Sequence, residues 1–315
     1  MNRFIRYFNQ NRKKIIISVA IIAFIIIIIR IIDSIYAKIN ISKIDNIIIN
    51  NENQPTESVI TGETVSQDIT SKNQNEIDNF INYCNNKQYN QAYELLTDEC
   101  KQEYNNDVNK FKENYVNKIF LTKKTYNIEL WLHKDYEYTY KVTLYNDDLL
   151  ATGGKNINTN YQDYITVSRK NDQGKINING FIKRNNIDKS IIVNNIEVVV
   201  NSQKIYKNYE VYNLIIRNRS DKTIALTNEK NGKDICIVDE NNVEYQALLN
   251  DTSIDQLKLR SAFEKNIDIK FNKIYDNYKV IKKIKLKNVI MDYEKYLQNN
   301  KDKSVETTEI EINVK

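Results

Sequence analysis

Apolar and polar positions follow three patterns along the chain, and the first is a continuous aliphatic run. Residues 15–32 read IIISVAIIAFIIIIIRII, with Arg30 near the end. A transmembrane helix needs about 20 apolar residues, and an arginine near the end of a slightly shorter run can extend its guanidinium to the headgroups. The run therefore predicts a single transmembrane helix. The alternative is a cleaved signal peptide, which requires small residues before the cut, but Ile35 stands two residues before Ala37.

Helical spacing begins after residue 74. One apolar stripe of a helix is formed by residues at i, i+3, i+4 and i+7, which are Ile77, Phe80, Ile81 and Cys84. Asn75 precedes the stripe and is predicted to be the N-cap. A short second helix is predicted at residues 89–96 and a third at residues 108–119.

The apolar period changes to two near residue 126. Residues 126–132 and 136–144 alternate between apolar and polar side chains, as half-buried antiparallel strands do. Two more strands are predicted at residues 164–169 and 175–182. This pattern places Trp131, Glu129 and Glu137 on the outer face of the sheet. It places four tyrosines on the inner face: Tyr126, Tyr136, Tyr138 and Tyr140.

The third pattern, after residue 185, is a series of short strands separated by turns, which predicts an all-β sandwich. Residues 33–73 instead hold the chain's single proline among Ser, Thr, Asn and Gln, a linker composition. The predicted organisation is a cytoplasmic stub (1–14), a transmembrane helix (15–32), a flexible linker (33–73), an α+β domain with three helices on a curved antiparallel sheet (74–186) and a β-sandwich domain (187–315).

Charge adds a prediction of topology. The 315-residue chain has a formal net charge of +5. The first fourteen residues contain no acid and carry all of this excess on Arg3, Arg6, Arg12, Lys13 and Lys14, so the remainder is neutral. By the positive-inside rule, the N-terminus is cytoplasmic and the bulk of the chain is extracellular. A nucleic-acid-binding domain should show a clustered basic face, so we expect the lipid bilayer but no nucleic acid as a partner.

Candidate chemistry is sparse. His133 is the single histidine, it is followed by Lys134 and Asp135 as in an exposed turn, and no Cys/His cluster exists. We therefore expect no metal, no cofactor and no catalytic residue. Cys84 and Cys100 either pair or remain, with Cys236, buried thiols. The four tyrosines form either a packed core or partner groove, or the lining of a ligand pocket.

Two segments resemble known families. Residues 77–104 (IDNFINYCNNKQYNQAYELLTDECKQEY), with the helix around Phe111 and the strands that follow, resemble the nuclear-transport-factor-2-like fold. Residues 212–226 (YNLIIRNRSDKTIAL) resemble the opening of immunoglobulin-like modules on Gram-positive surface proteins. The Ile-, Asn-, Lys- and Tyr-rich composition is similar to that of clostridial-type bacteria. The whole plan resembles membrane-anchored envelope proteins of these bacteria.

The resemblance implies a membrane-anchored extracellular module that binds other envelope proteins or cell-wall components without catalysis. One alternative is a small-molecule-binding or isomerase-type enzyme that uses the cone-shaped cavity of the first domain. Such an enzyme would need a buried acid on the inner face. Another alternative is an accessory subunit of a conjugation or secretion channel, since some anchored subunits of this kind also use nuclear-transport-factor-2-like domains.

Overall fold

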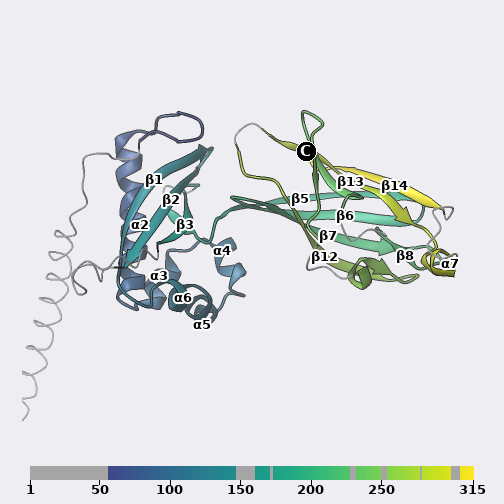
Figure 1. Ribbon diagram of the computed structural model, residues 1–315, viewed down its shortest axis with the longest axis horizontal. Helices are drawn as coiled ribbons and strands as arrows, with labels where there is room; N and C mark the ends of the chain where they lie inside the picture. Colours follow the sequence, from purple (N-terminus) through teal and green to yellow (C-terminus); the bar gives the residue numbers. More distant parts are fainter. Residues whose placement is uncertain are drawn as a thin grey trace, which may run out of the picture. The chain divides into compact units, whose positions relative to one another are not determined.

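The computed structural model describes residues 56–146, 160–170, 173–227, 232–249, 254–276, 279–298 and 306–315 (Figure 1). The predicted stub with its five basic residues, the predicted membrane helix and most of the predicted linker lie outside these ranges. Within them, no helix is both long enough and apolar enough to cross a membrane. The described chain is a mixed α+β protein with few helices and mostly antiparallel sheets.

Five short helical segments follow one long helix. Helix α2 (Gln67–Asn85) begins at Ser66, whose Oγ accepts a hydrogen bond from the amide of Ile69 at 3.4 Å. The predicted cap at Asn75 is therefore wrong, and residues 67–73 of the predicted linker are helical, because Ser66 supplies the cap and Asp68 the first-turn acid. The later segments are α3 (Tyr89–Glu94), α4 (Asp98–Glu103), α5 (Val108–Phe111), the π-helical η2 (Lys112–Val116) and α6 (Asn117–Ile119).

These helices share a core with the first sheet. The sheet is antiparallel with the order β1 (Lys124–Lys134), β2 (Glu137–Asn146), β3 (Tyr161–Ser168) and β4 (Lys175–Asn177). The apolar stripe of α2 is buried against it, as predicted: Ile77, Phe80, Ile81 and Cys84 are at most 1% exposed. A bulge in β1 between Leu130 and Leu132 interrupts the alternation. Leu130 joins the helix-covered core, whereas Trp131 and Leu132 pack in a separate cluster with Ile182 and Tyr275.

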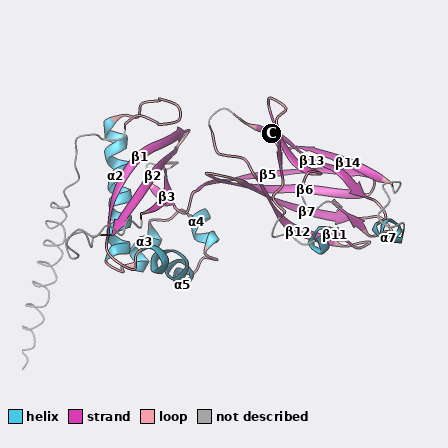
Figure 2. Cartoon of the chain, in the orientation of Figure 1, coloured by secondary structure: helices cyan, strands magenta, loops and turns pink. Residues whose placement is uncertain are grey.

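The remaining strands form two further sheets (Figure 2). One has the order β12 (Glu264–Phe271), β7 (Glu210–Asn218), β6 (Ile196–Tyr206) and β5 (Phe181–Val193). The other contains β10 (Glu244–Gln246), β9 (Ile235–Asp239), β13 (Ile281–Ile290), β8 (Ile224–Ala225) and β11 (Lys258–Leu259), with β14 (Thr307–Asn313) paired to β13. The short helices η4 (Ile254–Leu257) and α7 (Tyr293–Gln298) lie between strands.

Both of these sheets contribute to one apolar core. Val198 of β6 and Leu214 of β7 come from one sheet, and Ile237 of β9 and Leu286 of β13 come from the other; all are at most 1% exposed. The predicted domain boundary at 186/187 falls inside β5, whose first residue belongs to the helix-covered core. The domain boundaries stay predictions.

Candidate functional site

The four predicted tyrosines occupy different environments. Tyr138 and Tyr140 lie in β2 and are buried in the helix-covered core, and Tyr126 in β1 packs partly buried against the same core. Tyr136 precedes β2 and is 61% exposed. Its predicted place on the inner face is therefore wrong, because the strand begins one residue later and Tyr136 belongs to the turn. The structure brings the other three to one face.

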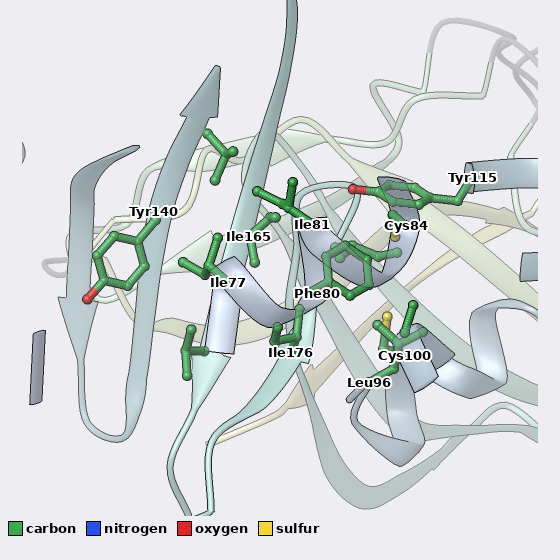
Figure 3. Close-up of a cluster of buried hydrophobic side chains, with 14 of the residues drawn as sticks. Ile77, Phe80, Ile81, Cys84, Leu96, Cys100, Tyr115, Tyr140, Ile165 and Ile176 are labelled. Carbon is green, nitrogen blue, oxygen red and sulfur yellow. The ribbon is translucent and has the colours of Figure 1, made fainter. Parts of the chain in front are cut away.

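Tyr140 combines a buried ring with a hydrogen-bonded hydroxyl. The side chain is fully buried near Ile77 and Ile165 (Figure 3). Its hydroxyl accepts a hydrogen bond from Asn73 Nδ2 at 3.0 Å, and Asn73 Oδ1 accepts one from Arg169 Nε at 2.5 Å. Burial raises the pKa of Tyr140 to about 12, partly offset by the Asn73 hydrogen bond. This hydroxyl is therefore already used inside the protein.

Tyr138 is packed against the single histidine. The rings of His133 and Tyr138 are stacked, with centroids 4.4 Å apart and an angle of 8° between their planes. His133 lies in β1, not in the exposed turn that was predicted, because β1 continues to Lys134. Its Nε2 lies 3.0 Å from the carbonyl oxygen of Asp135, and its Nδ1 lies 3.8 Å from Glu63. The imidazole thus packs on a tyrosine ring with polar neighbours at both nitrogens.

A buried acid also lies on the inner face, at a position that the sequence analysis missed. Asp163 of β3 is 3% exposed, and its two oxygens accept four hydrogen bonds. The donors are the Tyr115 hydroxyl (2.7 Å) and the amides of Tyr164 (2.7 Å), Asn179 (3.1 Å) and Gly180 (3.2 Å). Burial raises the pKa of Asp163, and these donors lower it. The carboxylate joins η2, β3 and the turn before β5, and its hydrogen-bonding capacity is used in doing so.

Part of the outer face of the same sheet is polar but also buried. Glu137 lies on this outer face, as the alternation predicts, but it is only 2% exposed. Beside it, the hydroxyls of Thr139 and Thr166 lie 2.9 Å apart, and both residues are fully buried. Asn177 of β4 donates to the carbonyl oxygen of Ile182 at 2.6 Å. The first residues of β5 therefore cover a face that strand alternation alone assigns to water.

A cleft of about 300 Å³ opens where Glu137 lies. Its uncharged lining includes Ser168, whose hydroxyl donates to Glu137 Oε1 at 3.1 Å, and Asn177, which accepts from the Thr97 hydroxyl. Its charged lining has both signs: Lys170, Lys175, Lys183 and Arg184, with Asp98, Glu99 and Glu137. All of these residues lie between residues 96 and 184.

Among the acids that line the cleft, Glu137 has a shifted pKa. Burial raises the pKa of its carboxyl group; the Ser168 hydrogen bond and the charges of Lys170 and Lys183 lower it, and Glu99 raises it. Among the described residues, Glu137 Oε2 has no hydrogen-bond partner, and the same is true of Arg184 Nε. Two residues that line the cleft, Glu137 and Arg184, therefore each keep one buried polar atom that no described residue satisfies.

The described residues contain no group of three or more metal-ligating side chains that could hold an ion. The three cysteines are free and buried (Figure 3 labels Cys84 and Cys100). Burial raises the pKa of all three thiols, to about 12 for Cys100 and about 11 for Cys236. Of the two possibilities left open for Cys84 and Cys100, the structure contains the unpaired thiols.

Comparison of the chain with protein-family models, with curated proteins and with solved structures finds no match.

Proposed function

We propose that the chain is a membrane-anchored extracellular protein of a Gram-positive envelope, and that it binds other envelope components without catalysing a reaction. In this proposal its first half has a nuclear-transport-factor-2-like fold and its second half an immunoglobulin-like sandwich. Helices on one face of the antiparallel sheet β1–β4, and two sheets sharing one core, support these assignments.

One observation carries the interaction role, namely that the inner face of the first sheet is packed. Tyr140, Phe80 and Phe111 are fully buried there, and Tyr115 is 1% exposed. Phe111 and Tyr115 stack at 5.9 Å. Two of its hydroxyls are also satisfied, since Asn73 donates to the Tyr140 hydroxyl and Asp163 accepts from the Tyr115 hydroxyl. A binding role on the outer surface fits this packing better than an internal reaction chamber does.

The rival isomerase-type enzyme requires an acid on that inner face that can exchange a proton with a ligand. Asp163 is the acid in that place, but it already accepts four hydrogen bonds from the chain. These four donors hold the Asp163 carboxylate in place as a hydrogen-bond acceptor within the fold. This saturation favours the interaction role over catalysis at the inner face.

In-cell photo-cross-linking of the full chain tests the interaction role. A photoreactive phenylalanine would replace Tyr136 or Phe263, which are 61% and 60% exposed, with fully buried Tyr140 as the matched control. We expect discrete adducts with the same envelope component in independent preparations from at least one exposed position, and none from position 140. Absence of adducts at every exposed large apolar position would count against the interaction role.

Protease treatment of intact protoplasts tests the location separately. The basic residues between Arg3 and Lys14 motivate a cytoplasmic N-terminus and an extracellular remainder. We expect added protease to digest the chain after Asp33, while a tag at the N-terminus survives until the membrane is permeabilised. Full protection of the region after Asp33 would overturn the proposed orientation.

A further inference from the structure

The C-terminal end of helix α2 and the segment before β1 form one surface. Lys87 follows α2, and its Nζ donates to the carbonyl oxygen of Phe120. The side chain of Asn85 donates to the carbonyl oxygen of Lys124 and accepts from its amide, each at 2.9 Å. These contacts hold residues 120–124 against the end of α2. We call the basic end the set Lys87, Leu121, Lys123 and Lys124.

The sequence around the basic end contains lysines but no acid. Residues 79–93 and 114–128 include four lysines and neither Asp nor Glu. One of the four, Lys118, lines a cleft with Glu103 and is not counted in the basic end. Lys87 and Lys123 are exposed and form no ion pair with any described residue. Residues 147–159, which follow β2, hold two Asp and one Lys, too few acids to neutralise three lysines.

The basic end also exposes an aliphatic side chain. Leu121 is 77% exposed, the highest fraction among the large apolar side chains of the described residues, whereas Phe120 beside it is 1% exposed. Apolar burial at the acyl boundary and attraction of ammonium groups to headgroups together bind proteins to anionic bilayers. A hydrated phosphate polymer offers only the second of these. The exposed leucine therefore favours a lipid surface over such a polymer.

The chain is long enough to bring this surface to its own membrane. Residues 33–55 separate the predicted transmembrane helix from the described residues, and fully extended they reach at most about 80 Å. Helix α2 has 19 residues and is therefore about 28 Å long. Although the basic end lies at the far end of α2 from residue 56, the connection spans more than this distance.

We propose that the basic end docks on the anionic lipid surface of the membrane that holds the chain. Leu121 enters the acyl boundary, and the lysines lie at the headgroup phosphates. This inference rests on the proposed membrane location, since that location brings the chain to a lipid surface.

Quenching of an introduced tryptophan by brominated lipids tests the docking. Full chains with Leu121→Trp, or with Phe263→Trp as an equally exposed apolar control, are reconstituted in phosphatidylcholine vesicles or in equimolar phosphatidylcholine and phosphatidylglycerol. The natural chain, with Trp131 as its single tryptophan, sets the background. We expect additional quenching at position 121 only with phosphatidylglycerol, lost in about 1 M salt, where the Debye length is about 3 Å. Absence of this quenching, or equal quenching at position 263, would overturn the proposal.

A charge reversal then tests the lysines. Lys123→Glu in the Leu121→Trp chain should abolish the additional quenching, because it replaces an attraction worth about fivefold in binding with a repulsion. Lys189→Glu is the matched control, since Lys189 is an exposed lysine of β5. Thermal unfolding confirms that both variants are folded. Quenching that survives Lys123→Glu contradicts the proposal. So does binding of soluble polyphosphate that needs Lys123 while position 121 is not quenched, because the basic end then recognises a phosphate polymer.

Flotation separates this inference from the proposed anchor. Phosphatidylcholine vesicles have no net charge, so flotation of the full chain with them tests the anchor and not the basic end. A chain that does not float with them lacks the proposed anchor. Salt-sensitive quenching of that chain at position 121 by added phosphatidylglycerol vesicles would still support the basic end, and its absence would overturn both.

Discussion

On the two faces of the first sheet, neighbouring residues of strand β2 are buried in different surroundings. On the inner face, Tyr138, Tyr140 and Val142 of β2 pack into an apolar core with the helices. On the outer face, Glu137 and Thr139 are equally buried but are polar. The hydroxyls of Tyr140 and Tyr115 and the carboxylate of Asp163 have partners within the chain, whereas Glu137 Oε2 has none among the described residues. The comparison separates polar groups that hold the fold together from a buried carboxylate oxygen that no described residue satisfies.

The largest expected effect concerns the inner face. Tyr140→Ala should lower the free energy of unfolding by about 3–5 kcal/mol, because it removes a fully buried aromatic ring. Tyr140→Phe should cost only about 1–2 kcal/mol, the effect of leaving the amide of Asn73 without its acceptor. Urea unfolding of residues 56–315 measures both. If Ala costs no more than Phe, the ring does not contribute to the core.

Asp78 in α2 gives a pH-dependent effect of up to about 4 kcal/mol. Burial raises its pKa from 3.8 to about 7, so the folded state binds the proton more tightly than the unfolded state. The stabilisation is complete below about pH 4 and is lost as the pH rises through about 7. Asp78→Asn should therefore match the natural chain at pH 4 and be more stable at pH 8. A difference in unfolding free energy that does not change with pH would contradict this.

The third effect tests the saturated acid on the inner face. Asp163→Asn should cost about 1–3 kcal/mol, because an amide offers one acceptor oxygen and turns its NH₂ group toward donors. Tyr115→Phe, which removes one of the four donors, should cost about 1 kcal/mol. The exposed Glu129→Gln serves as the control. If Asp163→Asn is as stable as the control, the hydrogen bonds of Asp163 do not stabilise the fold.

The smallest effect is a double-mutant cycle on the outer face. Thr139 and Thr166 are fully buried and their hydroxyls lie 2.9 Å apart. Either Thr139→Val or Thr166→Val alone leaves one buried hydroxyl unpaired and should cost about 1–2 kcal/mol. The double variant should cost less than the sum of the two, since no unpaired hydroxyl remains. Additive losses in urea unfolding would show that the pair does not act as a unit.

Strand alternation and helical spacing were enough to find the inner face. The period of two in β2 predicted that Tyr138 and Tyr140 share a face, and the α2 stripe predicted Phe80 opposite them. The same alternation contained a signal that was not used: Asp163 falls in phase with Ile165 and Val167, both buried. A carboxylate in phase with apolar neighbours predicts a buried acid, although its hydrogen-bond donors come from distant segments.

The outer face could not be predicted in the same way. Alternation implies that one face of an antiparallel sheet meets water, and this assumption placed Glu137 outside. Its burial depends on tertiary packing by β5, and no local pattern encodes this. The cleft likewise joins residues from Leu96 to Arg184 that are distant in sequence. The cap at Asn75 failed for a local reason, since Ser66 begins the helix before the apolar stripe starts.

The three buried thiols provide a way to measure how often each part of the fold opens locally. Oxidants and alkylating reagents attack the thiolate, and the raised pKa values of Cys84, Cys100 and Cys236 keep that form scarce while the surroundings remain closed. Cys84 and Cys100 belong to the core under α2, and Cys236 belongs to β9. The labelling rate of each thiol therefore reports how often its own region opens. The natural cysteines can therefore report local opening without an introduced probe, two of them in the helix-covered core and one in another sheet.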